Sequence, residues 1–199
     1  MRSFKDLTEA TGNAVFTLGR FNPPTTGHEK LITKLSSKAG SDPMYVFPTH
    51  TQDPKRNPLP HSLKIAYMKK MFRKYAKNIQ TSKARNVFEV AKILYDKGHK
   101  SITMVVGSDR VVEFNSLLKK YNGTKSTHGF YEFDNIDVVS AGDRDPDSEG
   151  VEGMSASKMR AAAQDGKKDD FMTGLPSSFK DGEKLYRDVR SNMGVREER

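Results

Sequence analysis

Apolar residues along the chain form short runs that alternate with segments of helical spacing. The run Ala14–Leu18 predicts a buried strand, and Glu29–Leu35 has apolar residues at helical intervals. Further strands are expected at 44–48, 101–106 and 136–140. Further helices are expected at 63–72, 87–96, 110–121 and 181–190, together with an alanine-rich helix that follows the segment at 154–160 and ends at Gln164. Ser62 and either Ser155 or Ser157 are the N-caps that we expect for two of these helices.

Strands and helices therefore alternate along most of the chain. Such alternation predicts an α/β fold, with a parallel sheet covered by helices on both faces. In these sheets, ligands bind in the crevice beyond the carboxyl ends of the strands, where the strand order reverses. The loops after Leu18 and after Val106 leave two such strand ends, so we expect these loops to meet in space.

The segment between the first strand and the first helix has the sequence GRFNPPTTGH, residues 19–28. A Gly/Pro turn that leads directly into a helix points backbone N–H groups and the positive end of the helix dipole at one small volume, which suits a phosphate. His28 is expected at the mouth of this volume. An alternative role for His28 is to cap its own turn.

The composition limits the class of protein. With 199 residues, 35% of them apolar, a single domain with one core is the expectation. No apolar run approaches the ~20 residues that a membrane span needs, and no signal-peptide core is visible. The absence of cysteine excludes disulfides, thiolate metal sites and a cysteine nucleophile, and it fits a reducing compartment.

The net charge of +9 is concentrated between Lys64 and Lys100, a segment with eleven Lys and Arg residues against two acidic ones. A basic sector of this kind could attract a nucleoside triphosphate, nucleic acid or an acidic partner. The alternative is a set of solvated faces on amphipathic helices. Within the long polar loop from Thr49 to Pro60, Lys55 and Arg56 could contact phosphates of an acceptor molecule, and the alternative is that they are solvated loop charges.

Two motifs together resemble a known family. GRFNPPTTGH is similar to the first signature of the nucleotidyltransferase superfamily, (H/T)xGH after a GxFxP turn, and MSASKMR, residues 154–160, is similar to its second signature, ISSTxxR. The resemblance extends over residues 14–179. It implies a Rossmann-like, doubly wound parallel sheet in one domain at 13–179, with a leader or arm at 1–12 and a C-terminal helix and charged tail at 180–199.

The chemistry fits these residue types. Attack on the α-phosphate of a nucleoside triphosphate builds up negative charge, so the protein mainly has to position the reactants and supply cations. The resemblance implies catalytic roles for His28, Arg160 and Thr25, and nucleotide contacts by Gly19, Arg20, Phe21, Gly27, Gly107, Ser108, Asp109, Ser155 and Ser157. Asp109 has the alternative role of capping the helix that follows it. Magnesium is expected with the triphosphate, held largely by substrate and water. Separately, His50, His61, His99 and His128 show no metal-ligand spacing and are expected at the surface or in packing.

The finer features of the motifs point in different directions. Thr25 stands where many relatives have a first histidine, and threonine there resembles the phosphopantetheine adenylyltransferases. Arg20 resembles the archaeal-type nicotinamide mononucleotide adenylyltransferases. We therefore expect transfer of AMP, or alternatively CMP, from ATP or CTP to a small phosphorylated acceptor such as nicotinamide mononucleotide, with release of pyrophosphate. The alternative function is a non-catalytic nucleotide- or nucleic-acid-binding protein on the same scaffold.

The first residues also resemble known sequences. Residues 1–10, MRSFKDLTEA, are similar to short leaders on proteins of large tailed bacteriophages, which are cut after a Leu-x-Glu sequence, here after Glu9. This resemblance implies a protein in the cytoplasm of an infected cell, with packaging in the virion as a further option. The alternative interpretation of residues 1–10 is a plain amphipathic first turn. The acidic segment 141–153 is expected to be a mobile loop. A homo-oligomer is left open, and no membrane partner is expected.

Overall fold

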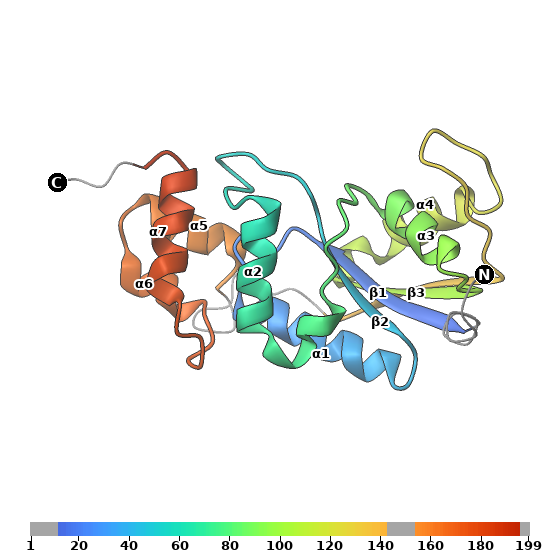
Figure 1. Ribbon diagram of the computed structural model, residues 1–199, viewed down its shortest axis with the longest axis horizontal. Coiled ribbons are helices and arrows are strands. Elements are labelled where there is room, and N and C mark those ends of the chain that lie inside the picture. Colours follow the sequence, from blue (N-terminus) through green and yellow to red (C-terminus); the bar gives the residue numbers. More distant parts are fainter. Residues whose placement is uncertain (1–11, 143–153, 196–199) are drawn as a thin grey trace, which may run out of the picture. The chain divides into compact units, whose positions relative to one another are not determined.

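The computed structural model describes residues 12–142 and 154–195, and Figure 1 shows its elements. The strands are β1 (Asn13–Gly19), β2 (Met44–Pro48), β3 (Ser101–Val106) and β4 (Asn135–Ser140). The α-helices are α1 (Thr26–Ala39), α2 (His61–Met71), α3 (Val87–Asp96), α4 (Val111–Lys120), α5 (Ala156–Gln164), α6 (Lys168–Thr173) and α7 (Gly182–Asn192). Two 3-10 helices, η2 (Arg73–Asn78) and η3 (Ser108–Arg110), complete the chain order. The leader with its cleavage point, most of the acidic segment and the last four residues lie outside the described residues.

The predicted elements are largely confirmed. The helix expected at 87–96 coincides with α3, and Ser155 is the N-cap of α5, where its side chain accepts from the N–H of Lys158. The prediction for Ser62 is wrong, because Pro60 occupies the N-cap position of α2 and no side chain caps that helix. Proline fixes its own φ, so the helix start is set there by backbone geometry rather than by a hydroxyl group.

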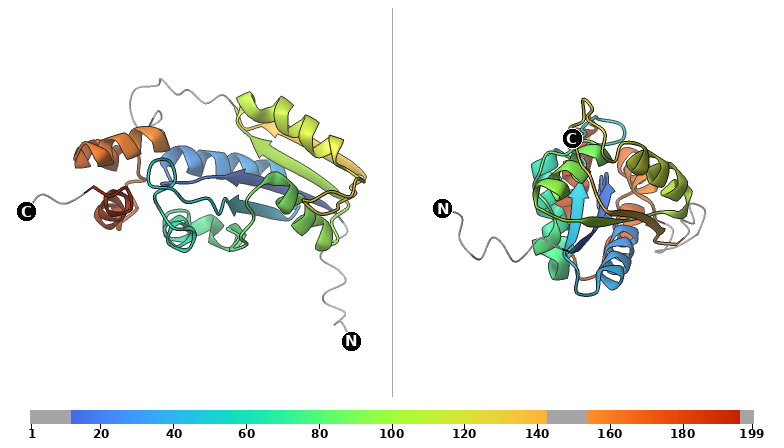
Figure 2. Two further views of the ribbon diagram at one scale, coloured as in Figure 1. Left: turned by 90° about the horizontal axis from the view of Figure 1, so that it is seen from above. Right: turned by 90° about the vertical axis from the view of Figure 1, so that its right-hand side faces the viewer.

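The sheet has the strand order β2-β1-β3-β4, and β1 to β3 and β3 to β4 pair in parallel. One face of the sheet carries Phe16, Met104 and Ile136, which are buried in one core with residues of α3 and α4 such as Leu94 and Leu118. Helix α1 lies on the opposite face, as Figure 2 shows. The expected doubly wound α/β fold is therefore confirmed.

The strand order reverses between β1 and β3. The carboxyl ends of these two strands are neighbours, because the Thr17 hydroxyl donates to the Val105 carbonyl at 2.8 Å. This is the switch point at which ligands bind in open α/β sheets. No helix in the described ranges is long and apolar enough to cross a membrane.

The chain falls into two compact units, each built from three segments. Unit 1 contains residues 1–18, 33–47 and 84–144, and so holds nearly all of the sheet, α3 and α4. Unit 2 contains residues 19–32, 48–83 and 145–199, and so holds the turn after β1, α2 and the helices α5 to α7. Both signature motifs belong to unit 2.

Helix α7 is part of the packing of unit 2. Leu185 and Val189 on its inner face are fully buried, and α7 contacts both α5 and α6. A hydrogen bond from the Tyr67 hydroxyl to Asp188 joins it to α2. The C-terminal residues therefore support the elements that carry the motifs.

Candidate active site

The turn after β1 is folded around its own aromatic ring. Phe21 is fully buried and has a positive φ of 47°, which residues with a Cβ rarely adopt. Its ring comes so close to Gly19 that a Cβ on that residue would lie 2.8 Å from it. On its other side, the ring packs against the His28 imidazole, with 4.8 Å between the centroids. Gly19 and Phe21 therefore shape the turn and support the histidine.

Thr25 caps α1 and orients His28. The Thr25 Oγ1 accepts from the backbone N–H of His28 at 3.3 Å, which is the hydrogen bond of an N-cap. In the opposite direction, the Thr25 backbone N–H donates to the His28 Nδ1 at 3.0 Å, and the Thr25 hydroxyl lies 3.1 Å from the same atom. Because Nδ1 is an acceptor, the neutral ring carries its proton on Nε2. His28 therefore presents an N–H donor, and it also bonds to its own turn.

The N–H groups at the start of α1 are mostly used inside the protein. Thr25 donates to the ring, His28 donates to Thr25, and Thr26 donates to the Gly174 carbonyl at 2.9 Å. Among the described residues, no acceptor takes the N–H of Gly27. The turn thus offers a phosphate fewer backbone N–H donors than the sequence predicts.

Arg160 connects the second motif to the first. Its Nη1 donates to the backbone carbonyl of Asn22 at 2.8 Å, and its Nη2 donates to the Ser157 Oγ at 3.1 Å. Ser155 begins the same helix, and its Oγ accepts from the N–H of Lys158 at 3.1 Å. The guanidinium group is therefore fixed between two segments that lie 138 residues apart in sequence.

Further cations surround Arg160. Burial, and then the charges of Arg20 and Arg56, lower the pKa of Arg160, while Asp53 acts in the opposite direction. Arg20 and Arg56 are exposed, and guanidinium groups keep their charge at any ordinary pH. Three positive charges against one carboxylate make this part of unit 2 suited to a polyphosphate.

The Asp53 carboxylate is hydrogen-bonded to residues of its own loop. Its Oδ1 accepts from the backbone N–H groups of Lys55 at 3.0 Å and Arg56 at 2.7 Å, and its Oδ2 accepts from the Asn57 side chain at 2.6 Å. These hydrogen bonds hold the pKa of Asp53 below its usual value. The loop expected between 49 and 60 is therefore a compact turn that carries Lys55 and Arg56 on its outside.

Asn22 is a site residue that the sequence analysis missed. Its Nδ2 donates to the Leu59 carbonyl at 3.0 Å, and its Oδ1 accepts from the Leu59 N–H at 2.9 Å. The side chain is 1% exposed. Asn22 thereby ties the turn after β1 to the loop after β2, while its own carbonyl receives Arg160. The sequence signal for this role is a polar side chain between Phe21 and two prolines.

The other expected nucleotide contacts lie in unit 1. Gly107 follows β3, and Ser108 and Asp109 open η3. The alternative role of Asp109 is wrong, because Arg110 occupies the N-cap position of α4 and no side chain caps that helix. Contacts of Gly107, Ser108 and Asp109 with a nucleoside stay a prediction.

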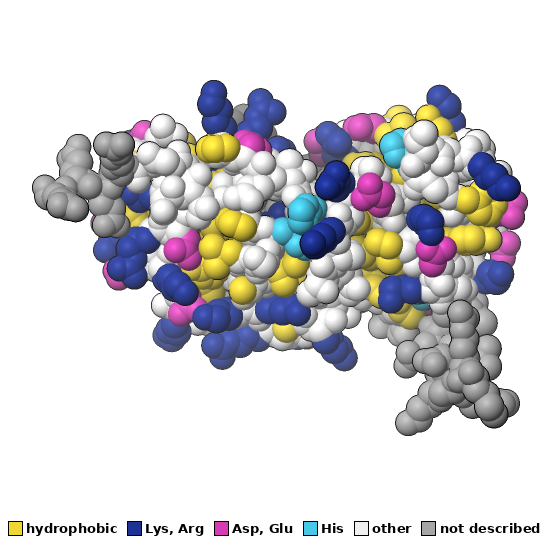
Figure 3. All heavy atoms as spheres, turned by 45° about the horizontal axis from the view of Figure 1, so that its top comes forward, with side chains coloured by type: hydrophobic (Ala, Val, Ile, Leu, Met, Phe, Trp, Pro, Cys, Tyr) yellow, Lys and Arg dark blue, Asp and Glu magenta, His cyan; other side chains and the backbone are white. Residues whose placement is uncertain are grey.

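The basic sector is not a uniform set of solvated charges. Its members are divided between the two units, and Lys64 is fully buried. Lys70 pairs with Asp181 and Lys92 pairs with Asp96. Figure 3 shows Lys and Arg side chains interspersed with acidic and hydrophobic ones on the visible face. Within the described residues, no group of three or more His, Asp and Glu side chains could hold a metal ion.

Comparison with known families decides the class of protein. The chain matches the cytidylyltransferase-like family over residues 16–162, a range that contains both motifs. The protein belongs to the cytidylyltransferase-like family. No curated protein matches the chain. Family membership makes the protein a nucleotidyltransferase with a nucleoside triphosphate as substrate. In this nucleotidyltransferase, the turn at 19–28 and the start of α5 are the two segments that Arg160 joins.

Proposed function

We propose that the protein transfers AMP, or alternatively CMP, from the nucleoside triphosphate to a small phosphorylated acceptor such as nicotinamide mononucleotide. An oxygen of the acceptor phosphate forms a bond to the α-phosphorus, the bond from that phosphorus to the bridging oxygen of the β-phosphate breaks, and pyrophosphate leaves. No general base is needed, because a phosphate acceptor is already ionised near neutral pH. The observation that carries the proposal is the bond from Arg160 to Asn22, which brings the second motif to the first.

His28 is the donor to the α-phosphate in this proposal. Support comes from the two contacts of Thr25 with Nδ1, which leave the proton of the neutral ring on Nε2. A fixed N–H donor lowers the barrier only where it stabilises charge that develops in the transition state. Gly27 adds the backbone N–H that has no acceptor among the described residues.

The arginines take the leaving-group side. Arg160, with the charges of Arg20 and Arg56 acting on it, offers guanidinium groups to the β- and γ-phosphates. The Ser157 hydroxyl, which accepts from Arg160, keeps its own proton for a phosphate oxygen. Magnesium would be bound by the triphosphate and water, and would neutralise charge on the departing pyrophosphate.

The direct test is pyrophosphate release by the purified full chain with magnesium, ATP or CTP, and a panel of phosphorylated acceptors. His28→Ala and Arg160→Ala should each lower turnover on the order of 10²-fold with little change in folding. His128→Ala, which removes an exposed histidine of unit 1, is the matched control and should leave turnover unchanged. Failure of every triphosphate and acceptor pair to release pyrophosphate would refute the proposal.

A second variant pair tests the donor itself. His28→Gln places an amide N–H near the position of Nε2, whereas His28→Asn places one near the position of Nδ1. If the donation from Nε2 matters, the glutamine variant should keep more turnover than the asparagine variant. Equal losses would contradict the assignment of the donor atom and leave the transfer reaction itself intact.

A further inference from the structure

A second group of polar side chains lies where α2 begins and β2 ends. Lys64, on the first turns of α2, is 0% exposed, and its Nζ donates to the Thr49 carbonyl at 2.7 Å. His61, the first residue of α2, packs its ring against that of His50 with 4.8 Å between centroids. We call Thr49, His50, His61 and Lys64 the His61–Lys64 cluster. All four belong to unit 2.

Two polar atoms of the cluster are buried and have no partner in the described part of the chain: the Thr49 Oγ1 and the His61 Nε2. The neighbouring Pro48 backbone favours the charged form of His61 and so opposes the lowering of its pKa by burial. A buried polar atom without a hydrogen-bond partner disfavours the folded state. A cluster with two such atoms therefore fits a ligand that bonds to both.

The charge around the cluster identifies the kind of ligand. Burial is the main cause that lowers the pKa of His61, and the charges that also lower it are those of Lys64, His50 and Lys83. These groups come from α2, from the loop after β2 and from the segment before α3, and none of them is acidic. A carboxylate or phosphate oxygen would satisfy Thr49 and His61 and offset this positive charge.

The cluster is joined directly to the signature turn. The Thr49 N–H donates to the Gly19 carbonyl at 2.8 Å. The loop that separates Thr49 from His61 is held to the same turn by the two hydrogen bonds between Asn22 and Leu59. A molecule that reacts at the signature turn can thus extend to the cluster.

We infer that the His61–Lys64 cluster binds a second oxyanion of the acceptor, separate from the phosphate that attacks. This inference rests on the proposed function, and it assigns the acceptor to the class of small molecules with two separated acidic groups. The negative charge of the oxyanion favours the protonated, charged form of His61. Affinity for the second oxyanion therefore rises as the pH falls through the range in which His61 titrates.

The test follows the ring C–H signals of the histidines by NMR on the full chain. Inorganic phosphate and malonate are the two probes, one for a phosphate source and one for a carboxylate source. The signals of His50 and His61 should shift saturably at probe concentrations on the order of 1 mM, and the pKa of His61 should rise by about one unit. His99 and His128, which lie in unit 1, should not move.

Thr49→Val separates ligand binding from packing. It removes a hydroxyl oxygen that has no described partner, so the Tm should stay the same or rise, while affinity for the effective probe should fall about tenfold. Lys77→Met, an exposed residue of η2, is the control and should change neither quantity. His61→Asn removes the imidazole and should abolish the response of His50, which keeps the inference testable if one variant folds poorly.

These measurements follow binding and stability and need no turnover. A negative result would therefore count against the inference without counting against the proposed transfer reaction. A protein that releases pyrophosphate while His50 and His61 ignore both probes would overturn the inference alone. A Thr49→Val variant with a lower Tm and unchanged probe affinity would also overturn it, because the hydroxyl group would then serve packing only. A shift of both histidines that disappears in Thr49→Val supports it.

Discussion

Replacing Lys64 by methionine should remove a pH-dependent cost from the folded state. The side chain is 0% exposed, and burial lowers its pKa from 10.5 to about 8. At about 1.4 kcal/mol per pKa unit, folding then disfavours the ammonium form by about 3 kcal/mol relative to the amine. The folded protein releases this proton near pH 8, whereas the unfolded chain holds it to about pH 10.5. The unfolded state therefore binds more protons within that window, so stability rises with pH there, and the full cost applies below pH 8.

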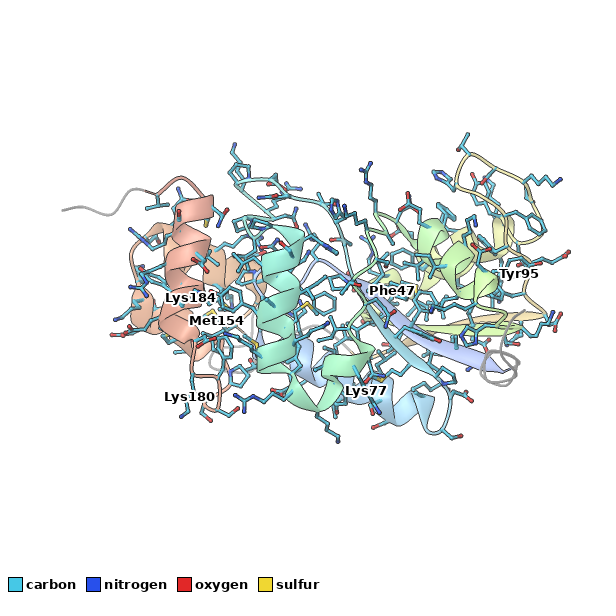
Figure 4. The ribbon with its side chains drawn as sticks, viewed as in Figure 1. Phe47, Lys77, Tyr95, Met154, Lys180 and Lys184 are labelled. Atoms are coloured by element: carbon cyan, nitrogen blue, oxygen red, sulfur yellow. The ribbon has the colours of Figure 1, made fainter. Side chains whose placement is uncertain are left out.

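The assay is urea unfolding of the wild type and of Lys64→Met from neutral pH to about pH 10.5. The unfolding free energy of the variant relative to the wild type should fall by about 3 kcal/mol across this range, because the titration of other groups cancels in the difference. Loss of the bond to the Thr49 carbonyl adds an offset that does not vary with pH. Lys77→Met, on exposed η2 (Figure 4), should show a flat difference. A difference for Lys64→Met that is constant within about 0.5 kcal/mol would refute the reasoning.

Three further variants test the contacts around the motifs. Thr25→Ala keeps the N–H that bonds to the imidazole but loses the capping hydroxyl, so it should lower the unfolding free energy in urea by about 1 kcal/mol. Its turnover should fall less than that of His28→Ala. Asn22→Ala leaves the Leu59 N–H and carbonyl unpaired and should cost about 1–3 kcal/mol; an unchanged urea midpoint would contradict that role. Gly174→Ala would put a Cβ 2.5 Å from the Met159 sulfur and should lower the unfolding free energy by about 1–3 kcal/mol. A Tm near that of the wild type would contradict this expectation.

Secondary structure was largely predictable because its signals are local. The helix α3 begins after Asn86, whose side chain accepts from the N–H of Glu89, and ends at Lys97-Gly98, where Gly98 has a φ of +92°. Cap, apolar spacing and terminating glycine all lie within one window of the sequence. The start of α2 was predicted wrongly because Ser62 is a common cap residue, whereas the deciding residue is Pro60.

The contacts of the candidate site could not be predicted because they join distant segments. The sequence indicated that Arg160 and the turn at 19–28 act together, but its bond to the Asn22 carbonyl depends on how the chain folds between them. Lys64 is a sharper case, since its charge placed it in a solvated basic sector and the structure buries it completely. A lysine in an amphipathic helix gives no sign that a backbone carbonyl, here that of Thr49, will receive its ammonium group.

Thr25, which stands where many relatives have a first histidine, has two structural roles in the first motif. A hydroxyl group is small enough to cap α1 from within the turn, and the backbone N–H of the same residue reaches the His28 Nδ1. One residue therefore stabilises the helix start and orients the His28 ring through Nδ1. In the proposed reaction, Arg20 and Arg56, whose charges act on Arg160, supply positive charge on the leaving-group side. The His28 imidazole, held by Thr25, then acts on the α-phosphate.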